Sequence, residues 1–177
     1  MTQSFYRISS SGDKWYKPFK EIYTVSFPIH EQRTEAQQQA AFADDHYHLL
    51  VLIESDNLLS FIAYWDFSDY VYIEHLAVNP QFRGQEIGSK MLIAFAEKVE
   101  KTVLLEIDPL VDDISKKRLR FYKKLGYMVN PYEHFHPAYN PDYLPHQLLL
   151  LSHDIELVQS QFDKFSDDLA NIVMANL

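Results

Sequence analysis

The stretch HLAVNPQFRGQEIGSKML, residues 75–92, is the one that decides the fold prediction. It begins as the end of an apolar strand, passes through a loop that contains Gly84 and Gly88, and continues as an amphipathic helix. The N–H groups of a first helical turn have no partner within the helix, and the helix dipole favours negative charge there. We therefore expect the loop to bind an anionic group such as a pyrophosphate, with Arg83 and Ser89 adding donors.

This loop differs from two familiar phosphate-binding motifs. No Gly-Lys-Ser/Thr follows it, as in a Walker A motif, and its glycines lack the G-x-G-x-x-G spacing. A tight turn between strand and helix is the structural alternative. Glu86 is the least expected residue, because a carboxylate repels anions. We expect its backbone angles to suit a non-glycine residue, and its side chain to point away from the ligand and cap the first helical turn.

The composition is that of one compact domain. Of 177 residues, 47% are hydrophobic and 15% aromatic, and the formal net charge is −9. Such a charge argues against a nucleic-acid surface, and the absence of cysteine excludes disulfides, thiolate metal sites and a cysteine nucleophile. The first residues lack a signal- or transit-peptide pattern, and no apolar run approaches the ~20 residues that span a membrane. A cytoplasmic location is therefore expected.

Strand and helix patterns alternate along the chain. The sequence predicts strands at residues 5–8, 47–55, 58–67, 70–78, 102–108, 127–129 and 146–152, and helices at residues 13–27, 30–44, 87–101 and 112–125. The three strands between residues 47 and 78 are expected to form an antiparallel meander, whereas the later alternation of helix and strand implies some parallel pairing. Gly126 is expected to end its helix in a left-handed conformation.

The last segment, residues 154–177, is predicted to be a helical extension of a single domain that comprises residues 1–177. Its apolar side chains recur three and four residues apart, as expected for one stripe of a helix: Ile155, Val158, Phe162, Phe165, Leu169 and Ile172. This stripe packs on the domain's own core or forms an interface with a second copy or another partner.

A second stretch, SKKRLRFYKKLGY at residues 115–127, adds a resemblance. Together the two stretches resemble the GNAT superfamily of acetyl-CoA-dependent N-acetyltransferases, whose signature R/Q-x-x-G-x-G/A corresponds to residues 83–88, with Glu86 at the inner glycine. The resemblance covers about residues 49–152. It implies an α/β (α+β) fold, with a mixed, mostly antiparallel sheet of about seven strands flanked by helices. Strands four and five splay apart in that fold, and the C-terminal helix is an addition to it.

The resemblance also implies a co-substrate and a reaction. Acetyl-CoA would donate its acetyl group to the primary amine of a small molecule or peptide N-terminus, by direct attack in a ternary complex. The residues carried over to the coenzyme are Leu76, Ala77 and Val78 for the pantetheine arm, Arg83, Gly84, Gln85, Glu86, Ile87, Gly88 and Ser89 for the pyrophosphate, and Ser115 in place of an asparagine. A non-catalytic acyl-CoA-binding or interaction module is the alternative function.

Two residues are predicted to handle protons. Tyr122 lies two helical turns after Ser115 and matches the family's tyrosine that protonates the departing thiolate; packing beside the sheet is its alternative role. Glu74 is the leading base, because burial would raise the pKa of a carboxyl group in an apolar strand. The alternative is a paired or solvent-facing carboxylate. His75 is the competing base or an acceptor contact, on the opposite face unless a bulge intervenes.

The acceptor site is expected near the connection between the first two helices, where Phe27, His30 and Glu31 are candidate contacts; a plain helix connection is the alternative. The proline- and aromatic-rich segment with His134, His136 and His146 is read as a substrate wall or a structural loop. No metal is expected there, because the histidines lack an established ligand spacing.

Overall fold

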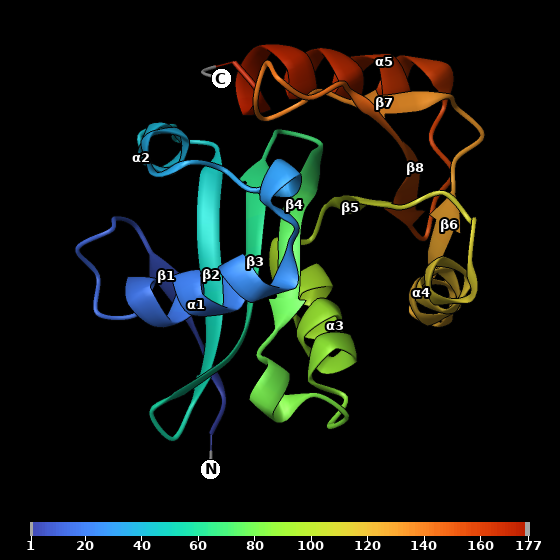
Figure 1. Cartoon of the computed structure of the whole chain (residues 1–177). Coiled ribbons are helices and arrows are strands. Elements are labelled where there is room, and N and C mark those ends of the chain that lie inside the picture. The colour runs from blue at the N-terminus through green and yellow to red at the C-terminus, as the bar shows by residue number, and fades with distance from the viewer. Residues whose placement is uncertain (1, 176–177) are drawn as a thin grey trace.

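The structure, a computed structural model, describes residues 2–175 and contains an eight-stranded mixed sheet (Figure 1). The strands are β1 (Ser4–Ile8), β2 (Tyr47–Glu54), β3 (Asn57–Asp66), β4 (Tyr70–Val78), β5 (Thr102–Ile107), β6 (Tyr127–Val129), β7 (His134–His136) and β8 (His146–His153). The α-helices are α1 (Tyr16–Ser26), α2 (Glu35–Phe42), α3 (Ile87–Val99), α4 (Asp113–Lys124) and α5 (Gln159–Asp168). The order of strands is β1-β2-β3-β4-β5-β8-β6, with β7 also paired to β8.

Strands β1 to β4 form the predicted antiparallel meander, and β4 and β5 are parallel. Ser55 and Asp56 join β2 to β3 with φ values of 50° and 62°, the left-handed conformation that a two-residue hairpin turn of this twist requires. Gly126 follows α4 with φ of 92°, as predicted. The expected mixed, mostly antiparallel sheet is confirmed, with one additional strand: β7 lies in the segment that was read as a loop.

The two faces of the sheet carry separate cores. On one face α1, α2 and the C-terminal segment cover a cluster that includes Phe19, Phe61 and Trp65, all nearly inaccessible to solvent. On the other face α3 and α4 cover a cluster that includes Met91 and Phe95. Full burial of a large apolar side chain contributes about 1.5–3 kcal/mol to stability, so both layers hold the sheet firmly. The region where β4 and β5 meet is therefore packed on both faces of the sheet.

The C-terminal segment consists of α5 and a π-helical turn at Leu169–Val173, and it packs on the same face as α1 (Figure 1). Phe165 and Leu169 of the predicted stripe are buried there, whereas Ile155 and Val158 precede the helix and are exposed. Residues 176 and 177 of the predicted extension lie outside the described residues. Within residues 2–175, no helix combines the length and apolar character needed to span a membrane.

Candidate active site

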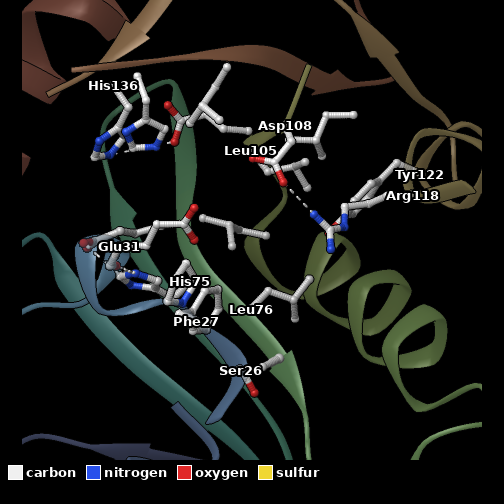
Figure 2. Close-up of a pocket in the computed structure, with 18 of the residues that line it drawn as sticks. Ser26, Phe27, Glu31, His75, Leu76, Leu105, Asp108, Arg118, Tyr122 and His136 are labelled. Atoms are coloured by element: carbon white, nitrogen blue, oxygen red, sulfur yellow. Dashed lines mark hydrogen bonds and ion pairs between the residues drawn. The ribbon is translucent and has the colours of Figure 1, made fainter. Parts of the chain in front are cut away.

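The cleft between β4 and β5 exists because these parallel strands pair only at their beginnings. Tyr70 to Tyr72 pair with Thr102 to Leu104, and no further pair follows before the strands end at Val78 and Ile107. The resulting cleft has a volume of about 420 Å³ and is lined by both strands, the α1–α2 connection, α4 and the β7–β8 hairpin (Figure 2). The splaying of strands four and five predicted from the sequence is thus confirmed.

The residues of β4 that are predicted to bind the coenzyme lie along this cleft. Leu76, Ala77 and Val78 all line the cleft, and their backbone pairs with β3 on one side only. The edge that faces β5 has no strand partner in the described chain. Backbone groups along such an edge can hydrogen-bond an extended ligand in the way a neighbouring strand would.

The loop of the opening stretch borders a second hollow of about 420 Å³ that includes Arg83, Gly84, Gly88 and Ser89. Gly84 has φ of 82°, and a Cβ atom at this position would meet nothing within 4 Å. At Gly88 a Cβ atom would lie 3.4 Å from Cγ2 of Val78, so the missing side chain lets α3 approach β4 closely. Ile87 also borders the hollow, whereas Gln85 lies outside both hollows of the described chain.

Glu86 corrects two expectations. Its φ of 58° and ψ of 21° are left-handed, which is the region favoured by glycine and not the one expected for this side chain. Its carboxylate makes no capping hydrogen bond to α3, so the predicted cap is also wrong. The carbonyl oxygen of Glu86 accepts from the backbone N–H of Lys90 and the hydroxyl of Ser89. The loop thus keeps the backbone of a glycine while it carries an exposed glutamate.

Ser115 and Tyr122 lie on the same buried side of α4, as their spacing predicted, but only one of them lines the cleft. The backbone N–H of Ser115 donates to the Asp112 carboxylate at 2.7 Å, and the Ser115 hydroxyl oxygen accepts from the backbone N–H of Asp112 at 3.2 Å. These bonds form a capping box. The structure gives Ser115 a role at the start of the helix and places it outside the cleft lining, in place of the predicted coenzyme contact.

Tyr122 lines the cleft from α4, opposite the free edge of β4 (Figure 2). Its ring packs against Phe121 and Tyr127, with ring centroids 5.1 and 5.6 Å away. Burial raises the pKa of the Tyr122 hydroxyl to about 12, because the phenolate would lose its hydration. The hydroxyl therefore keeps its proton at neutral pH.

Glu74 is buried as predicted, but the expected rise in its pKa is wrong. Its side chain has no exposed surface, and it accepts hydrogen bonds of 2.8 Å from Arg33 Nε, Trp65 Nε1 and the Tyr139 hydroxyl. Burial alone would raise the pKa of Glu74, but the opposing charge of Arg33 and the hydrogen bonds from Trp65 and Arg33 lower it to about 2. A carboxylate held in this way is a poor proton acceptor, so Glu74 is a structural ion-pair partner.

A bulge in β4 places Glu74 and His75 on the same face. Ala63 pairs with His75 and Tyr64 pairs with Ile73, which leaves Glu74 without a partner across the strands. His75 Nε2 lies 2.8 Å from the carbonyl oxygen of Glu31, and His75 Nδ1 lies 3.7 Å from the Glu74 carboxylate. Burial lowers the pKa of His75, so the ring is neutral near pH 7 and donates through Nε2.

The acceptor candidates of the α1–α2 connection divide into two groups. Phe27 and Glu31 line the cleft, and the Phe27 ring lies 4.8 Å from that of His75. His30 lies outside the cleft lining, with its ring 5.9 Å from that of Tyr143 in the β7–β8 connection and 6.2 Å from that of His146, the first residue of β8. The structure thus brings Phe27, Glu31 and His75 together with Tyr122 in one cleft.

The sequence reasoning missed the cleft residue Glu106, and it left His136 open between a substrate wall and a structural loop. Glu106 of β5 lies 2.5 Å from His134 Nε2 and 3.9 Å from His136 Nε2, and it also accepts from the Tyr72 hydroxyl. His136 lines the cleft from β7, with Nδ1 2.7 Å from the carbonyl oxygen of Pro137. The only signal in the sequence was the His-x-His pattern. Among residues 2–175, no three or more histidine or carboxylate side chains form a group that could hold a metal ion.

Comparison with known proteins agrees with this geometry. Residues 13–127, well over half of the chain, match the sequence model of the acetyltransferase (GNAT) family. The chain belongs to the GNAT family of acetyltransferases. A GNAT-family structure from Bacteroides thetaiotaomicron superposes on this GNAT chain with a TM-score of 0.90 at 25% identity, covering 98% of this chain and 99% of the other.

More distant structures share the GNAT fold. Arabidopsis thaliana Naa50, in complex with a bisubstrate analogue, has a TM-score of 0.60 at 21% identity, over 88% of this chain and 100% of the other. Among curated proteins, YjbC of Bacillus subtilis strain 168, which carries an acetyltransferase assignment, is 31% identical over 133 residues, or 73% of this chain. This GNAT chain spans 60% of the length of YjbC.

Proposed function

We propose that this GNAT protein transfers an acetyl group from acetyl-CoA to a primary amine, by direct attack of the amine in a ternary complex. The observation that supports the proposal best is the free edge of β4 at residues 76–78, which faces Tyr122 across a single cleft. The cleft holds a strand edge and a protonated phenol, and the N-terminus of α3 borders the second hollow, with Val78 and Arg83 lining both. The alternative function, a non-catalytic acyl-CoA-binding or interaction module, does not require a protonated phenol in the cleft.

The residues present fit the coenzyme. Leu76, Ala77 and Val78 would bind the pantetheine arm through their backbone, and the loop from Arg83 to Ser89 would bind the pyrophosphate at the N-terminus of α3. Gly84 supports this assignment, because a side chain there would extend into open space that a ligand can use. When bound, acetyl-CoA supplies an acetyl group that is activated as a thioester.

The chain's own residues supply orientation and a proton. Tyr122 holds a proton on a hydroxyl whose pKa is about 12, and it can donate that proton to a strongly basic thiolate. Phe27 and His75 would form the wall beside the acceptor. Distantly related GNAT structures include the ribosomal-protein-S18-alanine N-acetyltransferase of Escherichia coli and an aminoglycoside 6′-N-acetyltransferase, whose acceptors differ greatly in size. We therefore propose the amine, in a small molecule or at a peptide N-terminus, as the common feature.

Thiol release from acetyl-CoA tests the proposal. The purified chain is incubated with acetyl-CoA and with polyamines, amino acids or short peptides, and free coenzyme A is measured against a reaction without acceptor. Acceptor-dependent release supports the transferase. Tight coenzyme binding by calorimetry without release for any amine contradicts it and favours the binding module.

A further inference from the structure

Four carboxylates line the cleft within residues 2–175, and three of them are engaged by cations or donors. Glu74 is paired with Arg33 at 2.8 Å, Glu106 with His134 at 2.5 Å, and Asp108 with Arg118 at 3.1 Å. The fourth, Glu31, has no side-chain donor within 3.5 Å in the described chain, and the nearest basic side-chain atom is His30 Nε2 at 3.8 Å. Glu31 is therefore the cleft carboxylate whose oxygens are most available to accept a proton.

We propose that Glu31 takes the proton from the acceptor amine, an assignment that rests on the transferase function proposed above. Its side chain is 28% exposed and borders the cleft from the short 3₁₀ turn Ile29–Glu31 between α1 and α2 (Figure 2). A ligand that enters the cleft can reach this carboxylate, in contrast to the fully buried carboxylate of Glu74. General bases have to lie within hydrogen-bond reach of the proton that they remove.

The turn that carries Glu31 is held by the bulge of β4. His75 donates through Nε2 to the carbonyl oxygen of Glu31, and Arg33 donates to Glu74, which occupies the bulge position. The backbone N–H of Arg33 also donates to the Tyr23 hydroxyl at 2.7 Å. Two separate elements, α1 and β4, therefore fix the backbone on either side of Glu31. In this arrangement His75 is a positioning residue for the base.

Charges from several elements face Glu31. Burial is the largest influence and raises the pKa of Glu31, and Asp108, directly after β5, raises it further by like-charge repulsion. His30 on the same turn, Arg118 of α4 and His136 of β7 act in the opposite direction. An ammonium group between Glu31 and Asp108 would be attracted by both carboxylates, and it could then transfer a proton to Glu31.

The proton balance of the reaction is complete with these groups. The ammonium nitrogen loses one proton to Glu31 and becomes a nucleophile, the new C–N bond forms as the C–S bond breaks, and the thiolate takes a proton from Tyr122. The nitrogen then loses its second proton, which restores Tyr122. Glu31 returns its proton to solvent, so the net products are the amide, the free thiol and one released proton. No oxidant, metal or further reactant is required.

Glu31→Gln tests the proposal, with Glu31→Asp as the conservative variant and Glu21→Gln, an exposed position on α1, as the matched control. We expect Glu31→Gln to lower kcat/KM for the amine by about 10²–10⁴-fold near neutral pH, as is usual for the loss of a general base. The rising acidic limb of the pH profile should disappear in Glu31→Gln and remain in Glu31→Asp. Coenzyme affinity and melting temperature should match those of Glu21→Gln.

A second measurement does not depend on turnover. Carbon-13 NMR of glutamate carboxyl groups, assigned by comparison with Glu31→Gln, should show Glu31 titrating above its ordinary pKa of 4.5 in the ligand-free protein. The assignment of Glu31 as the base would be overturned if its carboxyl group titrates at or below pH 4.5. It would also be overturned if Glu31→Gln keeps the acidic limb of the pH profile and a kcat/KM within about threefold of wild type. Neither result would contradict the proposed transferase function. Absence of acceptor-dependent release from the wild type would overturn both.

Discussion

Replacing Glu74 by glutamine separates a structural carboxylate from a catalytic one. The change keeps the size of the side chain and removes its charge, so Arg33, only 4% exposed, is left without its partner. Loss of one member of a buried ion pair costs about 3–5 kcal/mol. The pKa of Glu74 gives a similar free energy: lowering this pKa from 4.5 to about 2 corresponds to about 3 kcal/mol of stability at neutral pH. We expect Glu74→Gln to reduce the free energy of unfolding by about 3 kcal/mol.

The pH dependence gives this prediction its sign. Because the pKa of Glu74 is depressed in the folded state, its contribution is fully present above its ordinary value of 4.5 and declines as the pH falls towards about 2. Between about pH 6 and pH 3.5 the linkage relation gives a loss of about 1.4 kcal/mol for this group. The difference in unfolding free energy between wild type and Glu74→Gln should shrink by that amount over this interval.

Urea denaturation at several pH values is the assay, with Glu21→Gln as an exposed control. The double variant Arg33→Met, Glu74→Gln should be less destabilised than the sum of the single changes, because it removes the unpaired buried charge. A Glu74→Gln protein with wild-type stability, or a difference that is constant with pH, would refute the ion-pair reasoning. Wild-type stability combined with a lost acidic limb in the rate profile would restore Glu74 as the base.

Three further predictions concern the cleft and its loop. Tyr122→Phe should lower turnover by about 10²–10³-fold with little change in coenzyme affinity, measured by thiol release and calorimetry; equal turnover would remove Tyr122 from the mechanism. Tyr127→Phe is its matched control, since this buried hydroxyl has no hydrogen-bond partner among the described residues; it should keep turnover and raise the unfolding free energy by about 1 kcal/mol. Glu86→Gly should relieve left-handed strain and stabilise the protein by about 0.5–1 kcal/mol in urea titrations, with coenzyme affinity unchanged. Glu100→Gly, at the other end of α3 with φ of 53°, is the comparison, and a large gain in coenzyme affinity for Glu86→Gly alone would show that this carboxylate opposes the pyrophosphate.

The parts of the fold that were predictable from sequence are those with local causes. The meander, the crossover through α3 and the parting of β4 from β5 follow from strand patterns, turn residues and one loop with a family resemblance. β7 escaped prediction because it has three residues inside a proline-rich segment and exists only through its pairing with β8. The left-handed backbone of Glu86 was open to prediction, since the residue stands where the family signature has glycine.

The roles of Glu74 and His75 depend on contacts that no local pattern reveals. The bulge in β4 is defined by its register with Ala63 and Tyr64 on β3. The cation that lowers the pKa of Glu74 is Arg33, which lies 41 residues earlier in the chain. Period-two alternation placed the two side chains on opposite faces, and only the paired strand shows that they share one.

The bulge links stability and chemistry at the same point of the sheet. With regular pairing, Glu74 and His75 would face opposite sides, and the 3₁₀ turn with Glu31 would lose either the anchor of Arg33 or that of His75. The extra residue lets both hold the turn from β4, while the backbone beyond it, at Leu76 and Ala77, stays free of a strand partner towards β5. Because the Glu74 carboxylate already accepts hydrogen bonds from Arg33, Trp65 and Tyr139, it cannot also act as the general base. The ion pair and the proton acceptor are therefore separate carboxylates, and a change in the first should alter the second only by displacing the turn.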